Sequence, residues 1–228
     1  MRAWMGRRDR RGRDRCPLDS RVATREAGQA SRSVTHAATL GTAWLTAYRM
    51  LFTKSGLKPG QTMLVQGATG GVSTALIQLG RAAGMTVWVT GRDDAKRAAA
   101  ARLGAPAAFE PGARLSERVD AVFESVGEVT WAHSMRSVRP GGTIICCGAT
   151  TGQNPGADLQ RLFFLQLRVE GSTMGSRQEL VDLVRFVSQA HIEPEIAMVL
   201  PLDAAVTGVE AMLAGTAAGK IVFDIGAR

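Results

Sequence analysis

The sequence predicts an α/β fold, a doubly wound parallel sheet with helices on both faces. Three observations indicate it: a glycine-rich turn between an apolar strand and a helix, a series of short apolar runs, and helical patterns between most of these runs. Some runs are apolar throughout, such as Thr143–Cys147, which is typical of strands covered on both faces. The candidate strands are residues 62–67, 86–90, 106–109, 119–124, 142–147 and 168–172.

The first strand leads into the glycine-rich turn Gly67–Ser73, a helix and the second strand, which together form a βαβ unit. Glycine lets the backbone bend sharply and approach a pyrophosphate, and the helix directs free N–H groups and its positive dipole end at the phosphates. Where the fingerprint G-x-G-x-x-G has three glycines, this turn has Ala68, Gly70 and Ser73. We predict a dinucleotide site whose turn residues are Ala68, Thr69, Gly70, Gly71, Val72 and Ser73.

The end of the second strand indicates which dinucleotide binds. An acidic residue about 20 positions after the turn would bind the ribose 2′-hydroxyl of NAD. The sequence has Gly91 and Arg92 there, with Lys96 one turn into the next helix. A glycine leaves space, and two cations attract the extra phosphate of NADP. We therefore predict NADP(H) as the cofactor; the alternative is that Arg92 and Lys96 are solvated surface residues.

The sequence contains no recognisable metal-ligand pattern. Its 3 cysteines, Cys16 and the adjacent pair Cys146–Cys147, lack the spacing of a zinc site, and its 3 histidines are isolated from one another. We expect no bound metal and assign no catalytic residue. Neighbouring residues of a strand point to opposite faces, so we interpret the adjacent cysteines as strand-end thiols and not as a redox pair.

Residues 1–33 differ from the rest of the chain in composition. They carry 10 arginines and 4 acidic residues, whereas residues 34–228 carry 18 basic and 16 acidic residues. The segment has no hydrophobic periodicity, so we expect a disordered leader before a domain that spans residues 34–228. A secretory signal is excluded, because no apolar segment follows the arginines. Binding to nucleic acid or an anionic membrane and a truncated or misread reading frame stay open, and we rank the last first.

Composition also narrows the class of protein. No apolar run approaches the ~20 residues of a membrane span, and 3 cysteines do not indicate a disulfide-rich secreted protein. We expect a cytoplasmic protein whose partner is a small-molecule substrate, with no membrane or nucleic-acid partner.

Several motifs occur in order along residues 34–228. They are Ala47–Tyr48, the turn at 67–72, Leu103–Ala105, Asp120–Gly127, Arg139–Gly142 and Gly219–Val222. Together they resemble the medium-chain dehydrogenase/reductase superfamily, specifically its zinc-independent, quinone oxidoreductase-like branch. Members of that branch carry a β-rich substrate domain before the helix that here starts near Val34. The resemblance therefore implies that the N-terminal substrate domain is missing.

The resemblance also implies a cofactor that crosses the carboxyl ends of the strands. The loops after the fourth and fifth strands would approach its ribose, phosphates and nicotinamide, and a segment after the sixth strand would line the nicotinamide end. For Thr46 helix packing, and for Lys220 a solvated position, are the alternatives. The residues that the resemblance implies are Thr46, Ser125, Val126, Gly127, Cys147, Gly148, Ala149, Ser172, Thr173, Met174 and Lys220.

The implied function is hydride transfer from NADPH to a quinone or an α,β-unsaturated carbonyl compound. One alternative is a truncated NADP(H)-binding protein without turnover, and a weaker one is a nucleic-acid-associated protein that acts through its basic leader. The resemblance further implies a homodimer formed through residues 168–172. It also implies that the final strand, residues 220–225, normally returns to the missing domain and is left here with an open edge.

Overall fold

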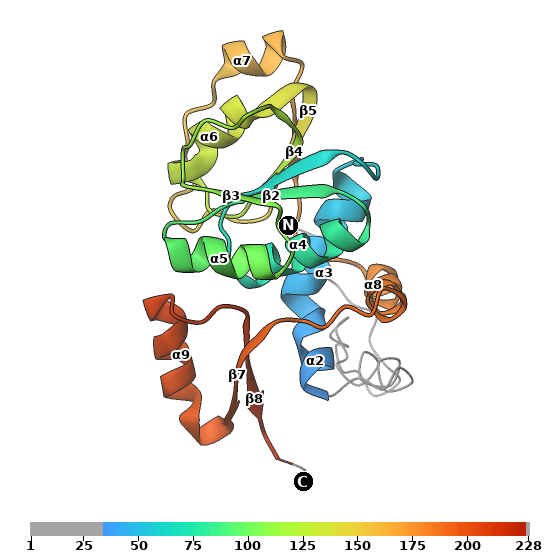
Figure 1. Ribbon diagram of the computed structural model, residues 1–228, viewed down its shortest axis with the longest axis vertical. Helices are drawn as coiled ribbons and strands as arrows, with labels where there is room; N and C mark the ends of the chain where they lie inside the picture. Colours follow the sequence, from blue (N-terminus) through green and yellow to red (C-terminus); the bar gives the residue numbers. More distant parts are fainter. Residues whose placement is uncertain (1–33, 227–228) are drawn as a thin grey trace, which may run out of the picture.

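The computed structural model describes residues 34–226, so the arginine-rich leader and Cys16 lie outside the described residues (Figure 1). Its centre is a six-stranded parallel sheet in the order β3-β2-β1-β4-β5-β6. The strands are β1 (Thr62–Val65), β2 (Thr86–Thr90), β3 (Ala107–Phe109), β4 (Val119–Glu124), β5 (Val138–Cys146) and β6 (Arg168–Gly171). The predicted fold class is confirmed, and each predicted strand overlaps one of these.

Helices cover both faces of this sheet. In Figure 1, α4 and α5 lie on one face and α6 on the other. Alternation along β2 divides the core accordingly, because Val87 and Val89 join the larger apolar core and Trp88 joins a second core with Met135 of α6. The helices are α2 (Val34–Thr39), η2 (Leu40–Trp44), α3 (Leu45–Tyr48), η3 (Arg49–Lys54), α4 (Gly71–Ala82), α5 (Asp94–Arg102), α6 (Glu128–Ser137), α7 (Leu159–Phe164), α8 (Arg177–Gln189), η4 (Leu202–Ala204) and α9 (Ala205–Ala214).

Helix α4 packs closely on the sheet at Gly80. A Cβ atom at this position would lie 2.8 Å from Met63 Sδ and 2.9 Å from Val87 Cγ2. Glycine therefore lets the helix approach β1 and β2 more closely than any other residue would. Because α4 begins at the glycine-rich turn, this contact also fixes the turn relative to the sheet.

A second, two-stranded sheet lies below the first in Figure 1. Its strands β7 (Ile196–Pro201) and β8 (Lys220–Asp224) pair in parallel, and η4 and α9 connect them. The sequence patterns did not predict β7. Pairing with β7 covers one edge of the final strand, so within residues 34–226 the expected open edge is confined to its other side.

The connection between β3 and β4 differs from its neighbours. Residues 110–118 form turns and irregular chain, whereas the other connections within the six-stranded sheet each contain a helix. A loop therefore stands where the alternating pattern places a crossover helix. Over the described range 34–226, no helix combines the length and apolar character needed to cross a membrane.

Candidate cofactor site

The glycine-rich turn lies at the carboxyl end of β1, a central strand. Gly67 has a φ of 86°, in the left-handed region that favours glycine. Gly70 is the N-cap of α4, no side chain caps this helix, and its first turn holds no acidic residue. The first backbone N–H groups of α4 are therefore available to an anion. Ser73 is buried, and its Oγ lies 3.7 Å from where a Cβ atom on Gly70 would stand.

A pocket of about 360 Å³ opens at this turn. Its walls come from the turn, the start of α5, helix α9 and strand β8. The predicted residues that line it are Thr69, Gly70, Gly71, Arg92, Lys96 and Lys220. The structure thus gathers residues from four separate segments of the chain around one space.

Lys220 reaches the glycine-rich turn from the second sheet. A Cβ atom on Gly71 would lie 3.1 Å from Lys220 Cδ and 3.2 Å from the Cβ of Ala43. The absence of a side chain at Gly71 is what lets the lysine stem and the helix before β1 approach the start of α4. This contact favours the site interpretation of Lys220 over that of an isolated surface lysine.

Arg92 and Lys96 meet at the C-terminal end of α9. Arg92 Nη2 and Lys96 Nζ each lie 3.6 Å from where a Cβ atom on Gly215 would stand, at the left-handed cap of that helix. Lys96 Nζ lies 3.8 Å from a carboxylate oxygen of Asp93, and Arg92 has no ion-pair partner among residues 34–226. Because none of the described residues that line the pocket is acidic, its charge favours a negatively charged ligand.

Gly91 does not provide the space expected of it. It is buried, and a Cβ atom there would lie 3.0 Å from Arg97 Cγ and 3.3 Å from the Cβ of Ala68. Its carbonyl accepts a hydrogen bond from Arg97 Nη1 at 2.7 Å. The expectation of room for a phosphate is therefore corrected: glycine is needed here for close packing of α5 on the turn. Arg97 itself forms ion pairs with Asp94 and Glu110.

The loops after β4 and β5 pack against each other beside the turn. A Cβ atom on Gly148 would lie 3.0 Å from the carbonyl oxygen of Ser125, and Val126 Cγ2 lies 3.6 Å from where a Cβ atom on Gly67 would stand. Close backbone approach therefore brings these predicted segments to the same edge of the sheet. Their predicted residues are Ser125, Val126, Gly127, Cys147, Gly148 and Ala149.

The segment after β6 reaches this edge beside β5. The backbone N–H of Ser172 donates to the carbonyl oxygen of Cys146 at 2.8 Å. Its hydroxyl oxygen is buried and has no hydrogen-bond partner within the described part of the chain. Buried polar atoms are normally paired, so an unpaired hydroxyl at this edge fits a site that a ligand completes. Met174 follows in a left-handed conformation with a φ of 48°.

Other predicted residues do not line the pocket. Thr46 Oγ1 donates to the carbonyl oxygen of Thr42 at 2.9 Å, so its hydroxyl is satisfied within the helix. Val72 packs against the larger apolar core. Thr173 is exposed beside Ser172. The structure therefore places these three side chains outside the pocket lining.

A buried polar network lies beneath the turn, and no motif predicted it. The N–H of Gly67 donates to Thr90 Oγ1 at 3.1 Å, and that hydroxyl donates to Gln66 Oε1 at 2.8 Å. Gln66 Nε2 lies 3.0 Å from Ser134 Oγ and 2.9 Å from His133 Nδ1. Gln66 directly follows β1 and Thr90 ends β2, each after a run of three apolar residues, and this was the available sequence signal.

Glu124 completes the network on the other side of Ser134. Its buried carboxylate accepts hydrogen bonds from the Ser134 hydroxyl at 2.6 Å and from the N–H groups of Val126 and Gly127 at 2.8 and 3.0 Å. Thr130 Oγ1 lies 2.9 Å from both carboxylate oxygens. A single buried carboxylate thus holds the loop after β4 in place, and the network connects that loop to the glycine-rich turn.

Comparison with known protein families identifies the family of this chain. The family described as zinc-binding dehydrogenase matches residues 71–189, from the start of α4 to the end of α8. The chain belongs to the zinc-binding dehydrogenase family. This family is part of the medium-chain dehydrogenase/reductase superfamily, so the resemblance seen in the motifs is confirmed at that level.

Individual relatives of the chain support this family assignment. The zinc-type alcohol dehydrogenase-like protein YogA of Leptosphaeria maculans is 34% identical over 200 residues, which cover 79% of this chain and 56% of the relative. The crotonyl-CoA carboxylase/reductase of Cereibacter sphaeroides is 29% identical over 191 residues, 68% of this chain and 44% of the relative. The solved structure of the 2-octenoyl-CoA carboxylase reductase CinF, in complex with NADP and 2-octenoyl-CoA, is 25% identical with a TM-score of 0.79, covering 86% of this chain and 52% of that one.

The chain spans about half the length of the curated relatives it matches. The family's description mentions zinc, but within residues 34–226 no group of three or more His, Cys, Asp or Glu side chains is arranged to hold a metal ion. Burial raises the pKa of the Cys147 thiol to about 11, so this thiol is protonated at neutral pH. The residues described therefore do not fit a metal site, and the zinc-independent assignment stays a prediction.

Proposed function

We propose that this chain is the cofactor domain of a zinc-independent NADP(H)-dependent oxidoreductase that reduces an α,β-unsaturated carbonyl compound or a quinone. The observation that carries the proposal is the pocket in which Arg92, Lys96 and Lys220 surround the uncapped start of α4. Phosphate groups bind to helix N-termini and to guanidinium and ammonium groups. This arrangement suits an adenosine 2′-phosphate beside a pyrophosphate.

Each part of the site has a role in this proposal. The first N–H groups of α4 bind the pyrophosphate, Arg92 and Lys96 bind the 2′-phosphate, and Lys220 adds charge next to the turn. Ser172 follows β6 at the carboxyl edge of the same sheet, and its hydroxyl has no hydrogen-bond partner within residues 34–226. Bound NADPH would supply the hydride, and the protein would supply binding and orientation. No side chain is assigned as a catalytic acid.

The relatives support the class of acceptor. Crotonyl-CoA and 2-octenoyl-CoA, which occur in the names of two relatives, are both α,β-unsaturated carbonyl compounds. The quinone acceptor rests on the motif resemblance alone. Both acceptors have an electron-poor atom that can receive a hydride from NADPH.

Cofactor titrations test the proposal. Purified chain should bind NADPH more tightly than NADH, and the double variant R92Q/K96Q should lose at least about tenfold in NADPH affinity with little change for NADH, because charge-assisted hydrogen bonds to the 2′-phosphate are removed. The matched control is R185Q, since Arg185 lies on α8 away from the pocket lining. Equal affinities for the two cofactors, unchanged in the double variant, would contradict the assignment.

Turnover is measured separately. Oxidation of NADPH, followed by its absorbance, should accelerate when an enone or a simple quinone is added. NADPH binding without turnover at any acceptor concentration would replace the enzyme proposal with that of an NADP(H)-binding protein.

A further inference from the structure

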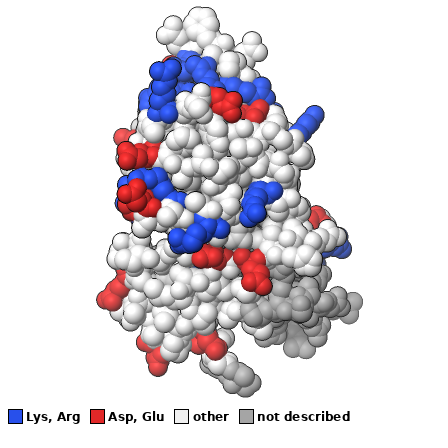
Figure 2. Space-filling model, viewed as in Figure 1, with Lys and Arg blue, Asp and Glu red and all other residues white. Residues whose placement is uncertain are grey.

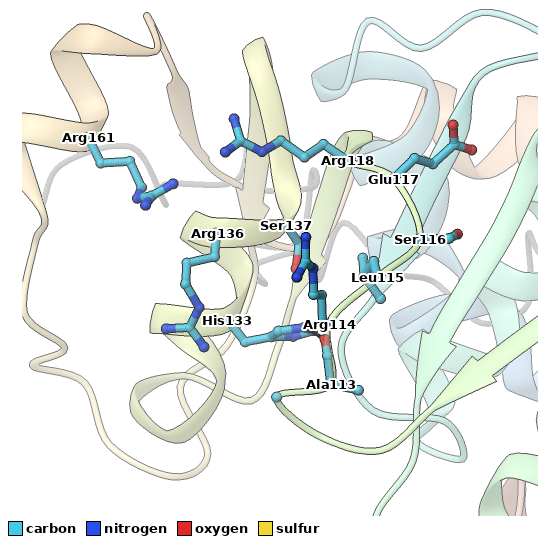
Figure 3. A pocket seen from close by; sticks show the side chains of 11 residues that line it. Ala113, Arg114, Leu115, Ser116, Glu117, Arg118, His133, Arg136, Ser137 and Arg161 are labelled. Atoms are coloured by element: carbon cyan, nitrogen blue, oxygen red, sulfur yellow. Dashed lines mark hydrogen bonds between the residues drawn. The ribbon is translucent and has the colours of Figure 1, made fainter.

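A second pocket, of about 500 Å³, lies on the α6 side of the six-stranded sheet. Its walls come from the β3–β4 connection, α6 and α7 (Figure 3). It shares no lining residue with the cofactor pocket. The side chains that carry its chemistry are Arg114, Arg118, His133, Arg136, Arg161 and Glu117.

The lining of this arginine pocket is strongly positive. Arg114, Arg118 and Arg136 have no carboxylate partner within 4.0 Å among residues 34–226, whereas Arg161 Nε lies 3.4 Å from a carboxylate oxygen of Asp158. Glu117 is the one acidic residue among the described residues of the lining. In Figure 3 its carboxylate points away from the arginines.

The arginines that line the pocket come from different elements. In Figure 3, Arg118 of the connection and Arg161 of α7 extend toward each other across the pocket. The guanidinium group of Arg114 lies below Arg118, beside Ser137, and Arg136 of α6 points away from that pair. Figure 2 shows Lys and Arg side chains gathered in this region of the surface, below α7. Nearby arginines outside the lining are engaged instead: Arg139 with Asp120 at 2.6 Å, and Arg168 with the hydroxyl of Thr143 at 2.9 Å.

The fold leaves this space open because of a missing crossover helix. Residues 110–118 connect β3 to β4 as a loop. The groove beside α6 is therefore covered by one irregular segment and not by a helix. Arg114, Arg118 and Arg136 are exposed around this concave space and have no carboxylate partner among residues 34–226, so their summed charge would attract an anion. A planar guanidinium group matches phosphate oxygens through paired hydrogen bonds.

We propose that the arginine pocket binds a small phosphorylated compound, one that carries a pyrophosphate or two phosphate groups, at a site separate from the cofactor. Its four guanidinium groups against one carboxylate suit a ligand of two to three negative charges. A nucleic-acid strand is disfavoured, because the lining formed by residues 112–161 contains no Phe, Tyr or Trp on which bases could stack.

Binding of inorganic pyrophosphate, measured by calorimetry at low salt with saturating NADPH present, tests the proposal. The full chain should bind one pyrophosphate at this pocket, and R114Q/R136Q should weaken that binding at least about tenfold through loss of charge-assisted hydrogen bonds. The matched controls are R185Q, away from both pockets, and R92Q/K96Q in the cofactor pocket, which should both bind pyrophosphate as the unaltered chain does. R118Q, a single exposed substitution, provides a second test if the double variant does not fold.

The outcomes separate this proposal from the proposed cofactor site. If R92Q/K96Q lost pyrophosphate binding while R114Q/R136Q and R118Q kept it, the proposal for the arginine pocket would be overturned and the cofactor proposal would stand. If NADPH failed to bind while pyrophosphate binding still depended on Arg114 and Arg136, the cofactor proposal would be overturned and the arginine pocket would stand. Tighter binding of a short single-stranded oligonucleotide than of pyrophosphate, with the same dependence on arginine, would also overturn the assignment to a small molecule.

Discussion

The surroundings of His133 fix its protonation state. Its Nδ1 faces the Gln66 amide nitrogen at 2.9 Å, and its Nε2 faces the carbonyl oxygen of Ala113 at 2.9 Å. A neutral ring with its proton on Nε2 satisfies both contacts, since the amide then donates to Nδ1. Burial lowers the pKa of His133, although the hydrogen bond to Ala113 opposes this shift. The neutral ring is therefore the form that the folded network accepts.

The protonation of His133 should make stability depend on pH. The folded-state pKa lies below the ordinary value of 6.5, so the unfolded chain binds the proton more readily. The stabilising contribution is complete above about pH 6.5 and decreases as the pH falls below it. Urea denaturation at pH 7.5 and 5.5 should show a smaller loss of unfolding free energy in H133Q than in the unaltered chain.

The matched control for this measurement is H191N, because His191 is exposed and has a left-handed φ of 50° that asparagine tolerates. It should retain the pH dependence of the unaltered chain. An identical loss on acidification in H133Q and H191N would show that His133 is not the group responsible.

At the scale of elements, the contact of α4 with the sheet places the phosphate-binding turn. The apolar residues of α4 alone do not determine how closely the helix approaches β1 and β2. Gly80 does, because Met63 Sδ and Val87 Cγ2 fill the space where its side chain would stand. The spacing of the helix from the sheet, and with it the position of the first N–H groups of α4, therefore depends on one missing methyl group.

Replacement of Gly80 by alanine should destabilise the fold by about 1–3 kcal/mol, the usual cost of overpacking a core. Gly41 provides the matched control: nothing lies within 4 Å of where a Cβ atom on Gly41 would stand, and the helical G41A substitution should be neutral or stabilise by about 0.5–1 kcal/mol. Chemical denaturation of both variants measures the difference. Equal stabilities for G80A and G41A would show that α4 shifts without cost.

At the scale of the whole molecule, strand β6 is one edge of the six-stranded sheet. We propose that two copies pair through this edge to form a homodimer with a continuous sheet. Val169, which is 46% exposed on β6, would be covered in such a dimer. Sedimentation velocity should show a dimer that V169K converts to a monomer, whereas L213K, on the exposed face of α9, should leave it intact. A monomer in the unaltered chain would refute the proposal.

The sequence allowed the central sheet and the glycine-rich turn to be predicted because their determinants are local. Apolar runs mark strands buried on both faces, and Gly70 and Gly71 mark the start of α4 wherever the rest of the chain lies. Strand β7 could not be predicted this way, since its residues are partly or fully exposed and it pairs with a single strand. Its partner lies across η4 and α9 in the sequence.

The missed parts of the site depend on contacts between distant segments. Gln66 pairs with Ser134 across 68 positions, so no short motif contains both. A glycine at position 91 suggests open space, because a sequence does not show that Arg97 folds back over it. The arginine pocket has the same origin, since Arg161 and Arg114 line one space only once α7 and the β3–β4 connection are placed.

The walls of the cofactor pocket belong to two different sheets. Thr69 to Gly71 are fixed to the six-stranded sheet through α4, whereas Gly208, Lys220 and Phe223 belong to the two-stranded unit. A molecule bound between them would contact both units, and its binding free energy would oppose their separation. Local opening between the two units would then become rarer as the concentration of the ligand rises. A higher cofactor concentration would thereby slow proteolytic cleavage of the chain between α8 and β7.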